Sequence, residues 1–261
     1  MIARIQQGWW WFLDYRYALV WQTRALLSRT DARVYRHGAL VPVVVIPGIY
    51  ESWKFMRPLI DALHDHGHPV HVVSRLGRNR LRITKAAAVV AHHIRKQDLR
   101  EVVIVAHSKG GLTGKLVMTT MDPENRITGM AAVSTPFLGS RYAKLMLLPS
   151  LRAFAASNRD LRALGADERL NHRVVSIFGK FDPHIPETSE LTGARNVRVD
   201  IGGHFGIIGA PATASAVLQA VASLSSDPSW DAAAPSGAEA GTEDVHERQP
   251  LDRPDTTDKI D

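Results

Sequence analysis

The sequence predicts an α/β protein built on a mostly parallel sheet with helices on both of its faces. Short apolar runs rich in valine and isoleucine alternate along the chain with segments of helical periodicity. Because these runs are apolar nearly throughout, both faces of each strand are expected to be covered. The length of 261 residues and the 45% hydrophobic content suit one sizeable domain of this class with additional end segments.

The expected strands come in six runs that turn or helix signals separate. Pro47-Gly48 breaks the first run, Ser52 can cap the helix that follows, and Gly67 ends that helix. Within that helix, apolar residues recur at helical spacing. The strands are expected at residues 40–46, 70–73, 101–106, 129–134, 174–178 and 196–201. The helices are expected at residues 53–66, 85–96, 109–121, 140–164 and 212–224.

Composition divides the chain into three parts. Residues 1–32 are predicted as an aromatic amphipathic N-terminal helix, and residues 33–224 as the α/β catalytic domain, interrupted at about 137–170 by a short helical cap insertion. Residues 225–261 hold ten acidic and three basic residues and few large apolar ones, so we expect an acidic disordered tail. The remaining body is strongly basic, which suits either an anionic partner such as membrane lipid or an ordinary arginine-rich surface.

The N-terminal helix concentrates aromatic residues and arginines. Its longest uncharged run, residues 5–13, is far shorter than the roughly 18–20 residues that a membrane span requires. Asp14 and Arg16 interrupt the segment, so a signal peptide is not expected either. Such a helix can lie in a membrane interface, or it can pack on the domain, and both interpretations stay open. Its aromatic residues are Trp9, Trp10, Trp11, Phe12, Tyr15, Tyr17 and Trp21.

The motif that carries chemistry is Ala106-His107-Ser108-Lys109-Gly110, which directly follows an apolar run. A strand that ends in small-x-Ser-x-small and enters a helix forms the nucleophile elbow of serine hydrolases. The turn is so tight that the residues two before and two after the serine must be small. The hydroxyl is left at the carboxyl end of the strand and at a helix N-terminus, where the dipole favours developing negative charge. We therefore expect Ser108 to be a nucleophile.

Groups that follow other strands should meet Ser108, because the carboxyl ends of parallel strands share one edge of the sheet. Asp182 follows the fifth expected strand and His204 follows the sixth, within a Gly-Gly-His loop. The order Ser, acid, His along the chain is that of α/β-hydrolases. We expect His204 to take the serine proton and Asp182 to orient the imidazole. The backbone N–H groups of Ile49 and Lys109 are expected to form the oxyanion hole.

These motifs together resemble the small bacterial lipase family, the minimal α/β-hydrolases whose elbow begins with Ala instead of Gly. The likeness extends unevenly over residues 40–224 and is most specific in its last block. It implies the α/β-hydrolase fold, hydrolysis of carboxylic esters without a cofactor, and the roles given above for Ser108, Asp182, His204 and Ile49. Besides Asp182, the matching pieces are VIPGI (45–49), AHSKGG (106–111), STPFLGS (134–140), LTGARNV (191–197) and GGHFGII (202–208).

Three features depart from that family's pattern. Pro47 stands where His often precedes the loop glycine, and Lys109 stands where Met is common, which places a cation beside the nucleophile. The stretch at 140–164 is longer than in the minimal enzymes, and its apolar residues between 145 and 151 suit an acyl chain or packing on the core. The residues expected to contact the substrate are Tyr50, His107, Phe137, Leu138 and Phe205.

The residue types present exclude several kinds of site. With no cysteine, the chain has no disulfide, no Cys-bound zinc and no Cys nucleophile. His64, His66 and His68 are interpreted as a solvated helix end, not as a metal site. Nucleic-acid binding is not expected, because no motif or aromatic interleaving accompanies the arginines. A basic loop should lie near the active-site mouth, either solvated or holding an anionic group; its members are Arg75, Arg78, Arg80, Arg82 and Lys85.

We therefore expect a serine hydrolase that cleaves carboxylic esters of lipid or acyl type through an acyl-enzyme, with no metal and no cofactor. Two alternatives remain: an acyltransferase that uses the same three residues, and a non-catalytic binding protein that keeps only the fold. The expected location is the cytoplasm, and peripheral contact of residues 1–30 with the inner face of a membrane stays one of the two interpretations of the helix. The sequence leaves the oligomeric state open.

Overall fold

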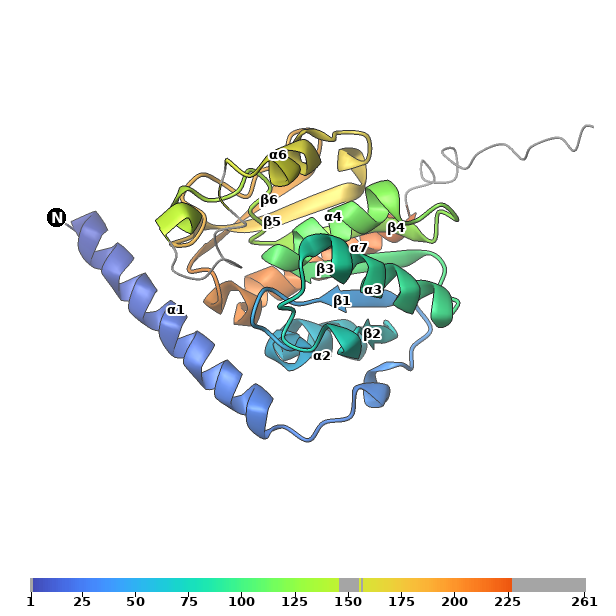
Figure 1. Cartoon of the computed structure of the whole chain (residues 1–261). Helices are drawn as coiled ribbons and strands as arrows, with labels where there is room; N and C mark the ends of the chain where they lie inside the picture. The colour runs from blue at the N-terminus through green and yellow to red at the C-terminus, as the bar shows by residue number, and fades with distance from the viewer. Residues whose placement is uncertain (1, 146–154, 156, 227–261) are drawn as a thin grey trace, which may run out of the picture.

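The structure is a computed structural model that describes residues 2–145, 155 and 157–226. Its centre is one sheet of six parallel strands in the order β2-β1-β3-β4-β5-β6 (Figure 1). The expected class, a parallel sheet flanked by helices, is confirmed. The strands are β1 (Val43–Ile46), β2 (Val70–Val72), β3 (Val102–His107), β4 (Ile127–Val133), β5 (Val174–Phe181) and β6 (Arg195–Gly202).

Helices cover both faces of this sheet, and a separate apolar core fills the space on each side. In β1, Val44 and Ile46 enter the core beneath α3, α4 and α6, whereas Val43 and Val45 enter the core beneath α2 and α7. All four side chains are fully buried, which explains why β1 is apolar at every position. The helices are α1 (Ile2–Leu27), α2 (Arg57–Asp65), α3 (Ile83–Lys96), α4 (Lys109–Thr120), α6 (Arg159–Ala166) and α7 (Pro211–Ser226).

The six expected strands and the helices expected at 85–96, 109–121 and 212–224 exist with shifted ends, whereas two expected helices differ. The segment expected as one helix at 53–66 is a 3₁₀ turn, Trp53–Met56, followed by α2. Pro58 explains the division, because proline lacks an N–H and fits only the first turn of an α-helix. Of the helical stretch expected at 140–164, the structure describes a 3₁₀ turn, Arg141–Leu145, and the start of α6. The apolar residues at 146–151 and most of the predicted acidic tail lie outside the described residues.

The long helix α1 lies along one side of the domain (Figure 1). It contacts the end of β6 and the 3₁₀ turns Trp53–Met56 and Gly206–Gly209, which lie at the carboxyl-end edge of the sheet. Packing on the domain, one of the two interpretations of this segment, is therefore observed. Neither α1 nor any other described helix has the length and hydropathy needed to span a membrane.

Candidate active site

The serine motif forms a strained turn between β3 and α4. Ser108 has φ 51° and ψ −121°, a backbone conformation that an L-residue adopts only at an energetic cost. Gly110 permits the turn, because a Cβ at this position would collide with the backbone carbonyl of Ile46 in β1. The strain fixes the hydroxyl at the N-terminus of α4, as the elbow motif requires.

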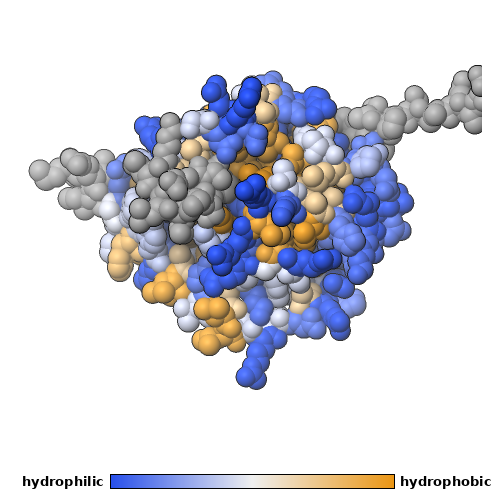
Figure 2. All heavy atoms as spheres, in the orientation of Figure 1, coloured by the Kyte–Doolittle hydropathy of each residue, from blue (hydrophilic) through white to orange (hydrophobic). Residues whose placement is uncertain are grey.

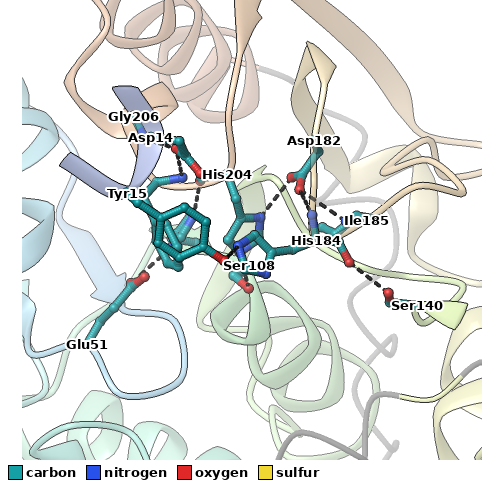
Figure 3. A network of polar contacts seen from close by, with 12 residues as sticks. Asp14, Tyr15, Glu51, Ser108, Ser140, Asp182, His184, Ile185, His204 and Gly206 are labelled. Carbon is teal, nitrogen blue, oxygen red and sulfur yellow. Dashed lines mark hydrogen bonds and ion pairs between the residues drawn. The ribbon is translucent and has the colours of Figure 1, made fainter. Parts of the chain in front are cut away.

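Ser108, His204 and Asp182 form one hydrogen-bonded chain at the carboxyl ends of β3, β6 and β5 (Figure 3). The Ser108 Oγ lies 3.0 Å from His204 Nε2, and His204 Nδ1 lies 2.8 Å from Asp182 Oδ2. The second Asp182 oxygen accepts the backbone N–H groups of His184 (2.8 Å) and Ile185 (3.1 Å). Because the carboxylate can only accept, Nδ1 carries the proton, and Nε2 is left as the acceptor for the serine hydroxyl.

The electrostatics of this chain favour ionised Asp182. Burial of Asp182 opposes its charge, but the charge and hydrogen bond of His204 and the N–H of His184 outweigh it and lower the pKa of the carboxyl. For His204, burial likewise opposes the imidazolium, yet the adjacent Asp182, with help from Asp14 and Glu51, raises its pKa. The imidazole is therefore a stronger base than an isolated histidine, as abstraction of a hydroxyl proton demands.

A second buried network links the loops around this chain. Glu51 accepts the backbone N–H of Gly48 at 2.7 Å and contacts Nδ1 of His107 at 2.9 Å. Nε2 of His107 donates to the backbone carbonyl of His204 at 3.0 Å. Glu51 and His107 are both essentially inaccessible to solvent. Together they tie the loop after β1, the elbow and the His204 loop to one another.

Helix α1 supplies a third support for the histidine. Asp14, 1% exposed, accepts the backbone N–H groups of Phe205 and Gly206 through one oxygen, each at 2.7 Å (Figure 3). Gly203 has φ +119°, and a Cβ there would lie 2.6 Å from the same oxygen. A glycine is thus required both for the backbone conformation and for the approach of α1. The carboxylate holds the loop immediately after His204.

Comparison with solved structures identifies the architecture, although no protein-family model and no curated protein sequence matches. A mature lipase from Bacillus licheniformis is similar, with a TM-score of 0.59, 16% identity, and coverage of 71% of this chain and 92% of the lipase. A bromoperoxidase from Bacillus anthracis has a TM-score of 0.53, 12% identity and coverage of 71% and 93%, respectively. An esterase from Thermogutta terrifontis has a TM-score of 0.50, 15% identity and coverage of 72% and 92%.

The chain has the α/β-hydrolase fold. At these identities the likeness establishes the fold alone, and the similar structures bear the names of enzymes with different activities. Membership of the small bacterial lipase family stays a prediction. The activity of this α/β-hydrolase fold protein must therefore be argued from its site.

A cavity of about 350 Å³ opens beside Ser108. Both residues expected to form the oxyanion hole, Ile49 and Lys109, line it. No hydrogen bond from either backbone N–H occurs within the described part of the chain, so both donors are available. The side chain of Lys109 points elsewhere: its amino group donates to the backbone carbonyl of Asn79 at 2.7 Å. Burial lowers the pKa of Lys109 to about 8.

The five residues expected against the substrate divide into two groups. Tyr50 and Phe205 line the cavity beside Ser108. His107 does not, because it is buried between Glu51 and the His204 carbonyl. Phe137 is fully buried in the core beneath α4, and Leu138 is 53% exposed and outside the cavity lining. The expectation of substrate contact for these three does not fit their positions.

Several residues that line the cavity were not predicted from the sequence, among them His184 and Tyr15. The His184 ring centroid is 4.9 Å from that of His204, and its Nε2 lies 3.3 Å from the Tyr15 hydroxyl of α1. Burial and the neighbouring His204 lower the pKa of His184 to about 4, so it is neutral at neutral pH. The position of His184, two residues after Asp182, could have indicated that it lies near the site. Nothing in the sequence indicates that Tyr15, 169 residues away, lies beside it.

The histidine string at 64–68 does not converge on a common point. His66 and His68 stack at 6.1 Å, and Nδ1 of His68 bonds the carbonyl of Val41. Within residues 2–145, 155 and 157–226, no group of three or more His, Asp or Glu side chains has an arrangement suited to a metal ion.

Proposed function

We propose that the protein is a serine hydrolase that cleaves carboxylic esters with an apolar acyl group. The observation that carries the proposal is the Ser108–His204–Asp182 chain, with contacts of 3.0 and 2.8 Å, opening into a cavity of mainly apolar lining. A strained elbow, a buried and oriented base, and two available backbone donors are the parts that acyl transfer to a serine needs.

In the proposed reaction, His204 Nε2 removes the Ser108 proton as the Oγ attacks the ester carbonyl. The tetrahedral oxyanion accepts hydrogen bonds from the backbone N–H groups of Ile49 and Lys109. His204 then donates the proton to the departing alcohol, which leaves an acyl-enzyme. A water molecule, deprotonated by the same nitrogen, attacks the acyl carbonyl. The bond to Ser108 Oγ then breaks, and His204 returns the proton to Oγ as the acid is released. Asp182 stabilises the imidazolium in both halves of the reaction.

The lining of the cavity supports an apolar acyl group as the substrate. Ile49, Ala143, Ile185 and Phe205 contribute apolar surface, whereas Gln22 and His184 contribute polar atoms. A volume of about 350 Å³ lies at the lower end of small-molecule sites, which span roughly 300–1,000 Å³. We therefore infer short or medium acyl groups as the best substrates among lipid-like and simple acyl esters.

The test is hydrolysis of a series of p-nitrophenyl esters of increasing acyl length by the wild type and by Ser108→Ala. Loss of turnover in the variant, with unchanged thermal stability, would support Ser108 as the nucleophile. Turnover that survives in Ser108→Ala would refute the mechanism. No turnover by the wild type, even with an added alcohol acceptor, would favour a binding protein, whereas ester formation with the alcohol would favour acyl transfer.

A further inference from the structure

The helix α1 divides into sides with different surroundings. Its inner side packs on the domain through residues that recur every three or four positions, the spacing of one helix face. These residues are Trp10, Asp14, Tyr17, Trp21 and Ala25. A neighbouring side lines the cavity through Tyr15, Ala18 and Gln22. The outer side is left without cover in the described part of the chain.

This outer side is unusually apolar for an exposed surface. Phe12 is 58% exposed, Leu19 70% and Leu27 77%. Trp9 and Val20 are exposed on the same side, and Arg16 lies between them. Figure 2 shows hydrophobic side chains spaced along the lower left edge of the molecule, where α1 runs. Contiguous exposed apolar side chains of this kind usually mark a surface that binds a protein partner or a membrane.

A basic loop lies beside this helix at the rim of the cavity. The guanidinium of Arg78 donates to the Gln22 side chain of α1 and to the Tyr50 carbonyl, each at 3.3 Å. Arg80 stacks over the Tyr50 ring at 5.8 Å. Arg75 and Arg82 are exposed in the same loop, and no ion pair involves them in the part of the chain that the structure describes.

We propose that the outer side of α1 and the loop at 74–85 form one docking surface for an anionic lipid membrane. This inference rests on the proposed function, since it places the cavity at the membrane surface where acyl esters reside. Aromatic and aliphatic side chains enter the boundary between head groups and acyl chains, and arginines attract the anionic head groups.

Charge favours lipid over a second copy of the chain as the occupant. Neither α1 nor the loop contains an acidic residue except Asp14, which is buried. Two copies docked through this surface would bring arginines together without exposed carboxylates to neutralise them. An anionic membrane supplies that missing charge. The contact is peripheral, because one side of a helix and one loop of the domain carry it.

The proposed docking surface adjoins the cavity. Tyr15 and Gln22 of α1 and Tyr50 beside the loop all line the cavity beside Ser108. A lipid bilayer that meets the helix and the loop would therefore meet the cavity rim between them. An acyl ester could then pass from the membrane to Ser108 without crossing water.

The test is co-sedimentation of the full chain with vesicles of phosphatidylcholine alone or mixed with phosphatidylglycerol. Phe12→Gln/Leu19→Gln removes apolar contacts, and Arg75→Gln/Arg82→Gln removes charges; none of the four residues lines the cavity. Matched controls on exposed positions near the opposite edge of the sheet are Leu40→Gln and Lys96→Gln/Arg100→Gln.

We expect the wild type to bind mixed vesicles and to release them as salt rises. The apolar pair should weaken binding roughly tenfold or more, and the arginine pair should weaken it only for mixed vesicles. The controls should bind as the wild type does. Absence of wild-type binding, or equal binding by all variants, would overturn the inference. So would a dimer in solution that Phe12→Gln/Leu19→Gln dissociates, since the surface would then be a subunit interface.

Turnover of a soluble short-chain ester, measured in parallel, separates this inference from the proposed function. Vesicle binding without turnover would remove the hydrolase proposal and leave the docking surface. Turnover without vesicle binding would remove the docking surface and leave the hydrolase proposal. The docking variants should keep the soluble-ester activity of the wild type, because their side chains lie outside the cavity.

Discussion

Removal of the Asp14 carboxylate should impair catalysis although Asp14 does not line the cavity. One of its oxygens accepts the backbone N–H groups of Phe205 and Gly206, the two residues that follow the base His204 in the chain. Without it, the loop that carries His204 keeps fewer fixed contacts. A displacement of about 1 Å in a catalytic group can cost roughly 100-fold in rate. We expect Asp14→Ala to lower kcat by about 10- to 100-fold with little change in KM.

The same substitution should destabilise the fold. Hydrogen bonds to a charged group contribute about 1.5–3 kcal/mol each. Two are lost, but the second Asp14 oxygen is buried without a hydrogen-bond partner in the described structure, so desolvation offsets part of their contribution. A net loss of about 3 kcal/mol follows, which for a chain of this size lowers Tm by roughly 6–12 °C.

Asp14→Asn separates the hydrogen bonds from the charge. An amide oxygen can still accept both N–H groups, so kcat near the pH optimum should stay closer to the wild type than in Asp14→Ala. The negative charge of Asp14 helps to raise the pKa of His204. Its removal lowers that pKa, and the acid limb of kcat/KM should move to lower pH.

Steady-state kinetics over pH with a soluble ester, together with thermal denaturation, measure all of these effects. Asp31→Ala is the matched control, because Asp31 caps a short turn at the surface, away from the cavity. It should leave kcat and the pH profile unchanged. Unchanged kcat in Asp14→Ala, or an acid limb that does not move in Asp14→Asn, would refute the positioning role.

Three further predictions follow from the titratable groups. Activity needs neutral His204, whose pKa is raised, so kcat/KM should fall as pH drops through a value above the ordinary 6.5 of histidine; a limb below 6.5 would contradict this. Lys109→Met should keep kcat within roughly tenfold, because the oxyanion donor is the backbone N–H; a larger loss in a folded variant would assign the side chain a catalytic role. Burial lowers the pKa of His71 to about 4, so the unfolded chain binds more protons between about pH 4 and 6.5, and stability should fall as pH falls through that window. Denaturant midpoints should show a smaller fall in His71→Asn, and an equal fall would assign the effect to other groups.

Much of the fold could be predicted because its signals are local. Strands β1 to β4 are buried on both faces, so apolar runs mark them, and Pro47 and Gly67 mark turns through backbone chemistry alone. The position of Asp182 and His204 near Ser108 followed from one rule of topology, that parallel strands end at the same edge. The structure places the three side chains in one hydrogen-bonded chain.

The supports of that chain could not be predicted in the same way. His107 is part of the serine motif, and its neighbours in the sequence suggested substrate contact. Its actual partner, Glu51, is 56 residues away, and nothing in the local pattern marks a Glu at that position as buried. Phe137 was expected to contact the substrate but lies in the core, for a related reason. An apolar side chain near a motif fits a pocket and a core equally well.

The N-terminal helix shows the limit most clearly. From the sequence, Asp14 looked like an interruption in an aromatic segment, useful only as an argument against a signal peptide. In the structure, Asp14 is buried on the inner side of α1 and accepts two backbone N–H groups from residues nearly 200 positions later in the chain. The two interpretations of the helix, packing and membrane contact, were posed as alternatives. They need not compete, because Asp14 and Phe12 point to different sides of one helix, and packing of the first is what holds the second outward.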